Sequence, residues 1–390
     1  MKKTLLAVAV LGAFATPALA DVTIIGGIAV GINRGSSSSV AGGAGNTVTG
    51  AIAPLGSVSN WSTSNNYSNV NLESVDDIGN GNKVVYHLQL QHNVTATGDV
   101  VGKRDSFIGL QGSWGAFRIG TNENIYEQYM YESDPLDGAV GAGGNLNLLG
   151  SPGYGTVFDV GNGGGAGFYR RTDHTVWYTS PDMNGFTFAV NYTLNAFKGR
   201  GGGLDPTILS MGAQFKQANW FANVGYEQHD DLNGLGTIAG TVATGSDDTG
   251  LQFGGGLTLG NINLYARWEN LEYNSTAAAG VNGYERDAVW VAIKVNNVGS
   301  GYFGAELGRA SDADCSVVGG GDCDASKSGA TLLGVGYFHN LSQRSQLQFI
   351  VSRTANDDNA SYFGIGAPGN GRGNFGSDHT AFTFNIKHVF

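Results

Sequence analysis

The chain has 390 residues and a formal net charge of −11, and only 14% of its residues are charged, whereas soluble domains carry about a quarter. Its 64 glycines, 7 prolines and abundant aromatic residues (16 Tyr, 19 Phe, 6 Trp) suit strands and turns better than helices. Beyond the first 20 residues, no stretch of about 18 apolar residues could form a membrane-spanning helix, and no basic patch supports nucleic-acid binding.

Residues 1–20 have the plan of a secretory signal peptide. Two lysines precede a short apolar run, and Ala18-Leu19-Ala20 supplies the small residues of a cleavage site. We expect cleavage after Ala20, which leaves one domain over 21–390. Loss of Lys2 and Lys3 lowers the basic count from 21 to 19 against 32 acids, so the mature net charge becomes −13.

The stretch that follows, "DVTIIGGIAVGIN", alternates between apolar and polar residues. Val22, Ile24 and Ile28 share one parity, while Thr23 and Asn33 share the other. This alternation predicts a strand with one apolar face and one wet face. The same pattern recurs at 83–93, 186–194, 220–227, 262–269, 288–295, 346–353 and 379–390.

Short and long connections alternate between these strands. Tight turns are expected at 77–82, 112–116, 180–185, 216–219, 259–262, 296–301 and 340–345. Longer polar or glycine-rich loops are expected at about 34–65, 94–102, 121–170, 195–206, 229–248, 275–284, 311–327 and 357–377. Seven turns and eight loops join sixteen strands, an even number with both ends on the short-turn side. This is the plan of an outer-membrane barrel, and sixteen strands leave room for an aqueous channel.

Two cysteines, Cys315 and Cys323, occur in one of the long loops. In an exported chain we expect them to form a disulfide, which would contribute about 2.5 kcal/mol through loop entropy. The aspartates around them admit two interpretations: a divalent cation site, or a solvated acidic loop, which is favoured. These are Asp312, Asp314, Asp322 and Asp324.

The chain ends in a strand, "HTAFTFNIKHVF", whose last residue is Phe390. We expect this strand to pair with 21–33 and so close an all-β, 16-stranded antiparallel transmembrane barrel, because an unpaired edge in lipid costs several kcal/mol per group. A secreted β-sandwich or β-helix is the alternative fold. It would not explain the outward parity of so many aromatic residues.

The sequence resembles the trimeric general porins of Gram-negative bacteria, in the form common among β-proteobacteria. The segments that resemble this family are "DVTIIGGIAVGIN", "SNVNLESVDDIGNGNKVVYHLQLQ", "KRDSFIGLQGSWGAFRIG", "RRTDHTVWYTSPDMNGFTFAVNYT", "GVGYFHNLSQRSQLQFIVSRTAND" and "FNIKHVF", in order along the chain. The resemblance implies a homotrimer in the outer membrane of a Gram-negative bacterium, in contact with lipid and lipopolysaccharide. It also implies that Phe390 is read by the barrel assembly machinery, and that neither a cofactor nor an enzymatic activity is expected.

The resemblance further implies that the third loop, about 121–170, folds inward and narrows the pore. The loop's acidic candidates for this constriction are Glu123, Glu127, Glu132, Asp134 and Asp137. The basic candidates on the barrel wall are Arg118 and Arg171, with Lys83 and Arg267 as further ones.

The basic wall residues of the family are partly missing here. Asn69 and Glu73 stand where the second strand usually carries basic residues, and Gly120-Thr121-Asn122 replaces a usual Gly-Arg-Gln. An acidic loop in an acidic chain focuses a negative potential in the pore. We therefore expect a passive channel for small hydrophilic solutes and ions that prefers cations. The alternatives are a substrate-selective channel on the same barrel and an outer-membrane enzyme or adhesin.

Overall fold

A computed structural model describes residues 22–66, 68–95, 101–137, 143–153, 167–194, 206–232, 245–276, 280–320, 323–362 and 375–390. The expected signal peptide, 1–20, lies outside these residues. Among the described residues, no helix is both long and apolar enough to cross a membrane.

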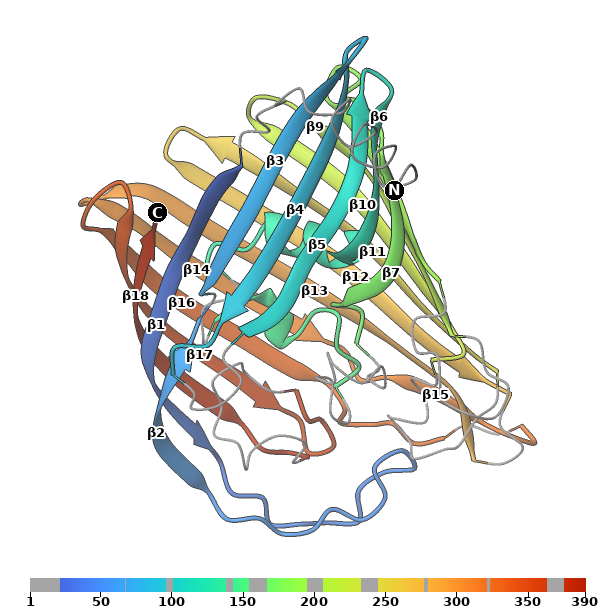
Figure 1. The fold of residues 1–390 in the computed structure, drawn as a ribbon. Helices are drawn as coiled ribbons and strands as arrows, with labels where there is room; N and C mark the ends of the chain where they lie inside the picture. The colour runs from blue at the N-terminus through green and yellow to red at the C-terminus, as the bar shows by residue number, and fades with distance from the viewer. Residues whose placement is uncertain are drawn as a thin grey trace, which may run out of the picture.

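The described chain is almost entirely β-structure (Figure 1). The strands are β1 (Thr23–Ser37), β2 (Val58–Asn65), β3 (Asn69–Gly79), β4 (Asn82–His92), β5 (Val101–Gly112), β6 (Gly115–Glu123), β7 (Arg171–Thr179), β8 (Phe186–Thr193), β9 (Thr207–Lys216), β10 (Trp220–Asp230), β11 (Ser246–Leu259), β12 (Ile262–Ser275), β13 (Val281–Val298), β14 (Gly301–Ala310), β15 (Asp314–Val317), β16 (Ala330–Asn340), β17 (Ser345–Asn356) and β18 (His379–Val389). The helices are α2 (Ile125–Glu132) and a 3₁₀ turn, η1 (Asn145–Asn147).

All described strands belong to one antiparallel sheet that closes on itself. β1 pairs with β18 from Gly27↔Val389 to Ser37↔His379, and the backbone of Phe390 exchanges two hydrogen bonds with Gly26 (3.0 and 3.1 Å). The predicted pairing of the first and last strands is therefore confirmed, and no strand edge is left at the seam.

The 18 strand segments make sixteen barrel strands. β2 and β3 both pair with β1, one after the other, so they are two pieces of a single broken strand. β14 and β15 likewise pair in succession with β13. The predicted number of sixteen is correct, but the sequence pattern did not predict either break.

The seven short turns all lie where the sequence placed them. Between β3 and β4, Asn80 and Gly81 both have positive φ, 55° and 75°. Two successive residues of this kind form the turn that matches the twist of a β-hairpin, and Asn-Gly is its preferred sequence.

Several long loops are shorter than expected. β1 continues to Ser37 and β2 begins at Val58, so the first loop is 38–57 and not 34–65. The expected loop 311–327 contains the short strand β15, and β6 extends to Glu123, so the third loop begins at Asn124. In each case polar or glycine-rich residues continue the ladder, because pairing with a neighbouring strand satisfies their backbone groups.

The alternation of side chains separates a lipid face from an inner face. Ile28 (47% exposed), Val289 (53%) and Ile386 (51%) point outward, whereas Asn33, Thr383 and Asn385 point inward and are buried. Across the inner face the polar side chains bond to one another, as Thr383 does to Asn33 (2.7 Å) and Asn385 to Gln348 (2.6 Å). The wall therefore offers a polar surface to the interior.

Candidate channel lining and constriction

The described parts of the segment between β6 and β7, residues 124–137, 143–153 and 167–170, pack against the inner face of the barrel (Figure 1). Its helix α2 starts with backbone N–H groups that no helical partner can satisfy. The barrel wall satisfies them: Ile125 N–H donates to Asn191 of β8 (3.3 Å), and Tyr126 N–H donates to Ser210 of β9 (3.1 Å). The start of the helix is thus fixed by side chains from two neighbouring strands.

Arg267 of β12 holds the other end of α2. Its guanidinium donates to the carbonyl of Tyr129, to Ser133 Oγ (3.2 Å) and to Gln252 Oε1 (2.5 Å). A cation at a helix C-terminus bonds the free carbonyls and interacts favourably with the helix dipole. Arg267, which the sequence suggested as a pore charge, is 3% exposed and caps the helix.

A buried ion pair ties the next part of the loop to the wall. Glu269 of β12 and Arg286 of β13 lie 2.8 Å apart, and both side chains are fully buried. Glu269 accepts hydrogen bonds from Gly150 N–H (2.8 and 2.9 Å) and from Tyr126 O–H (2.9 Å). Arg286 donates to the carbonyl of Ser151 (2.9 Å). One pair therefore binds both the helix and the turn that follows η1.

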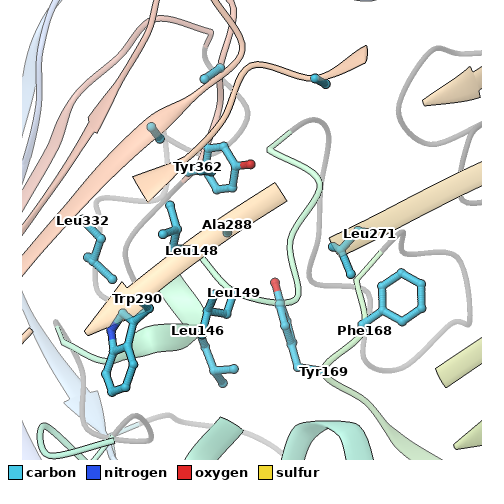
Figure 2. Close-up of a cluster of buried hydrophobic side chains, with 14 of the residues drawn as sticks. Leu146, Leu148, Leu149, Phe168, Tyr169, Leu271, Ala288, Trp290, Leu332 and Tyr362 are labelled. Carbon is cyan, nitrogen blue, oxygen red and sulfur yellow. The ribbon is translucent and has the colours of Figure 1, made fainter. Parts of the chain in front are cut away.

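Apolar residues of the loop form a core inside the barrel (Figure 2). Leu148 and Leu149 are fully buried, and they belong to one cluster with Trp290 of β13 and Leu332 of β16. The hydrophobic effect stabilises such burial by about 1.5–3 kcal/mol for each large side chain. The third loop is therefore packed against the wall like the core of a soluble domain.

Glu123 lies in a charged cluster at the junction of loop and wall. It forms ion pairs with Arg171 of β7 and with Arg104 of β5 (3.4 Å), while Arg171 also pairs with Asp105 (2.5 Å). The structure thus brings together two predicted residues, Glu123 and Arg171. Arg104 and Asp105 were not among the predicted pore residues, although "KRD" near the start of β5 marks them as charged wall residues.

The other acidic candidates also have partners. Glu132 lies 2.9 Å from Lys216 of β9, and Asp137 lies 2.9 Å from Lys387 of β18. Asp134 accepts the backbone N–H groups of Leu136 (2.9 Å) and Asn145 (3.2 Å). Within the described residues, the predicted acids are therefore largely matched by bases or by loop backbone.

Glu127 differs from the other acids because it is buried in α2. Its side chain is 7% exposed. Burial, followed by the nearby charge of Glu123, raises the pKa of Glu127 well above its ordinary value. This environment favours the neutral form, so Glu127 contributes less charge to the pore than the sequence suggested.

Of the remaining basic candidates, Arg118 lies near Asp105 of the charged cluster, whereas Lys83 lies apart from it. Arg118 of β6 lies over the ring of Phe107 (4.7 Å to the centroid), and His87 stacks against the same ring (5.4 Å). Lys83 is exposed beside the Asn80–Gly81 turn, at the end of the barrel. The structure therefore places Arg118 on the wall and does not bring Lys83 to the loop.

The two cysteines form the expected disulfide, with their Cα atoms 5.4 Å apart. The tip of the first loop docks on this region: Thr47 N–H donates to the carbonyl of Asp324 (2.9 Å), and Asp324 N–H donates to Thr47 Oγ1 (3.0 Å). Across the described ranges, no group of three acidic, histidine or cysteine residues is placed to hold a metal ion.

Comparison with known families gives a match over residues 7–359 to a model described as Gram-negative porin. The chain belongs to the Gram-negative porin family. It is similar to the major outer membrane protein P.IB of Neisseria gonorrhoeae, with 25% identity over 324 residues (81% of this chain and 77% of the relative). It is also similar to an outer membrane porin protein of Bordetella pertussis, with 26% identity over 336 residues (78% and 72%).

Other relatives match over a shorter span. The P.IB protein of Neisseria meningitidis serogroup A is 27% identical over 238 residues, which cover 60% of this chain and 62% of that protein. The relatives are named as outer membrane proteins and the barrel has an apolar belt, so this porin-family chain lies in the outer membrane.

Solved structures share the fold. An anion-selective porin from Comamonas acidovorans has a TM-score of 0.72 at 18% identity and covers 95% of this chain and 100% of its own. A trimer form of OmpT from Vibrio cholerae has a TM-score of 0.60 at 12% identity and covers 95% and 99%. At these identities the likeness concerns the barrel fold.

Proposed function

We propose that this porin-family chain forms a water-filled channel for passive diffusion of small hydrophilic solutes and ions, and that the channel prefers cations. The observation that carries the channel is a barrel whose inner face is polar, and the net negative charge of the chain supports the preference for cations. Family membership supports a channel in place of an enzyme, since the named relatives are porins.

The charges near the loop are close to balance. The acids Asp105, Glu123, Glu132, Asp134 and Asp137 face the bases Arg104, Arg118, Arg171, Lys216 and Lys387. Cation preference therefore rests mainly on the longer-range potential of a chain with a net charge of −11, which becomes −13 without Lys2 and Lys3. Such a potential is screened over about 10 Å at 0.1 M salt and about 3 Å at 1 M.

The test is the reversal potential of single channels in a planar bilayer under a potassium chloride gradient. We expect a cation-selective sign at about 0.1 M salt and a weaker preference near 1 M, because salt screens the potential. The anion-selective porin from Comamonas acidovorans shares the barrel fold, so anion preference is the specific alternative, and a reversal potential of anion-selective sign would overturn the proposed preference. Absence of any current from folded protein would overturn the channel itself.

Two substitutions test which carboxylate of the third loop contributes to ion selectivity. Glu123→Gln leaves Arg104 and Arg171 with one fewer acidic partner, so we expect the ratio of cation to anion permeability to fall. Glu127→Gln is the matched control, because burial already favours the neutral form of Glu127. Equal effects of the two substitutions would contradict this assignment.

A substrate-selective channel is the second candidate, favoured by the stack of His87, Phe107 and Arg118 on the wall. An aromatic ring beside a guanidinium suits solutes that carry a planar group and a carboxylate. Benzoate added to one side would then interrupt the current, and Phe107→Ala would abolish the interruptions. A passive channel would show neither effect.

We further propose a homotrimer inserted with the help of the barrel assembly machinery. The trimer form of OmpT supports this assembly for a barrel of the same fold. Current steps that arrive in threes, and a mass of three chains in detergent, would be the expected results.

A further inference from the structure

Three glycines on the inner wall face one leucine of the third loop. Gly304 of β14 and Gly334 and Gly336 of β16 all have inward parity, because their neighbours Phe303, Leu333 and Val335 are exposed to the outside. Gly304 and Gly336 are direct cross-strand partners. We call these three residues the glycine seat.

Leu136 occupies this seat and is fully buried. A methyl group added to Gly304 would lie 3.0 Å from Leu136 Cδ2, one added to Gly334 would lie 2.6 Å from Cδ1, and one added to Gly336 would lie 3.1 Å from Cδ2. Each distance is shorter than ordinary carbon–carbon contact, about 3.5–4.0 Å. A side chain at any of these positions would therefore push on Leu136, most strongly from Gly334.

The backbone gives no other reason for glycine at these positions. None of the three has positive φ, so other residues could adopt the same strand conformation. Glycine in a strand interior lowers stability, since it loses more backbone entropy on folding than other residues and offers no side chain to pack. At Gly304 the nearest atoms all belong to the loop, whereas a methyl group on Gly334 would first meet Glu306 and one on Gly336 would first meet Phe338 (2.9 Å). Space for Leu136 is therefore a reason for glycine shared by the three positions, and at Gly304 the loop alone supplies it.

Fully buried aromatic and aliphatic residues complete the seat. Phe338 and Ile350 are fully buried and form one cluster with Leu136, and Tyr302 stacks on Phe338 with 4.4 Å between ring centroids. Next to the seat, Asp137 pairs with Lys387 of β18. The loop thus crosses from β6 to the last strand, and Leu136 is its apolar contact on the far wall.

The same arrangement recurs along the loop. A methyl group on Gly308 of β14 would lie 2.6 Å from Leu148, and one on Gly250 of β11 would lie 2.8 Å from Phe168. Both glycines also lack positive φ. Inward glycines on several strands therefore accommodate apolar side chains of the third loop.

We propose that Leu136 in the glycine seat positions the tip of the third loop and so sets the width of the aperture. This inference rests on the proposed channel function. According to this inference, the third loop is held rigidly against the wall. Leu136 is then a positioning residue that solutes do not touch. Truncating Leu136, or filling the space that it occupies by adding a side chain to one of the glycines, should release the tip of the third loop from the wall.

The experiment compares Leu136→Ala with Leu333→Ala in planar bilayers. Leu333 lies beside Gly334 on the same strand but points to the lipid (52% exposed), so it controls for loss of a leucine from β16. We expect Leu136→Ala to raise the fraction of time in altered conductance levels about 30-fold or more. Leu333→Ala should leave the wild-type levels unchanged.

A second variant tests the seat itself. The atoms nearest to a methyl group on Gly304 all belong to Pro135 and Leu136, so Gly304→Ala should displace the tip. Combined with Leu136→Ala, its effect should shrink, because the leucine it collides with is gone. Wild-type conductance levels in both single variants would overturn the proposal, as would full additivity in the double variant.

Hydrogen exchange separates failure of this proposal from failure of the channel function. Gly144 N–H donates to buried Glu306 (3.0 Å) and Asn145 N–H to Asp134, so both report docking without any current. If the wild-type protein conducts nothing, the proposed function fails. Faster exchange at these amides in folded Leu136→Ala would still support the seat, and unchanged exchange would overturn it.

Discussion

Removal of Glu269 should release the third loop without unfolding the barrel. Glu269→Ala deletes the partner of buried Arg286 and the acceptor for Gly150 N–H and Tyr126 O–H. Breaking a buried ion pair by removing one partner costs about 3–5 kcal/mol, because the other charge stays buried and uncompensated. The strand ladders do not depend on this pair, so the cost falls on docking of the loop.

This cost in docking free energy predicts how much faster the backbone amides of the loop should exchange. Since about 1.4 kcal/mol corresponds to a tenfold change, amide exchange in Leu148–Gly150 should accelerate about 150- to 4,000-fold. Exchange followed by mass spectrometry on detergent-folded protein would measure it. Amides in the β16–β17 ladder, where Gly334 lies opposite Ser352, provide the internal reference.

A control variant and a double variant test whether the ion pair between Glu269 and Arg286 holds the loop. Glu285→Ala removes an exposed carboxylate next to Arg286 on β13, and it should leave the loop protected. Glu269→Met with Arg286→Met removes both charges, so it should cost less than Glu269→Ala alone. Unchanged exchange in Glu269→Ala, or a double variant worse than the single one, would show that the pair does not hold the loop.

Three further predictions concern the loops and the seam. Burial raises the pKa of Glu127 above its ordinary value of 4.5, so docking is strongest below that value and weakens as the pH rises from it through the raised pKa. Proteolysis of the wild-type loop should therefore become faster relative to that of Glu127→Gln as the pH rises across this window, and a constant ratio of the two rates would contradict this. Replacing Cys315 and Cys323 by serine should loosen the region that holds Thr47 by up to about 2.5 kcal/mol, measured as faster proteolysis within 38–57, and cleavage rates equal to wild type would refute this role. Phe390→Ala keeps the two backbone bonds to Gly26 but removes the aromatic ring. Slower assembly in cells, with unchanged stability of the folded barrel, would assign the assembly signal to the side chain. Assembly at the normal rate would refute this assignment.

The barrel could be predicted from the sequence because lipid imposes a strict period of two on its outer face. Ile28, Val289 and Ile386 follow that period, and turns such as Asn80-Gly81 separate the strands. The break between β2 and β3 was missed, since β2 consists mainly of polar residues and was assigned to the loop 34–65, whereas β3 alternates apolar and polar residues like the other strands. Only pairing with β1 distinguishes β2 from a loop.

The site was predictable by residue type but not by contact. The acids of the third loop were recognised, yet the partners of Glu123 and Asp137 lie on β5, β7 and β18, and only the register of the barrel brings them near. Arg267 has inward parity in the sequence, but nothing there indicates that a helix end covers it. Buried contacts between distant segments leave no local pattern.

The packed third loop has a consequence for the order of assembly. Its docking surface is spread over β8 to β17, and Asp137 reaches β18. The loop is made before most of these strands, so it has nowhere to bind until they have been added. The ion pair between Asp137 and Lys387 can form only after β18 has been added, so docking of the loop is completed late in the assembly of the barrel.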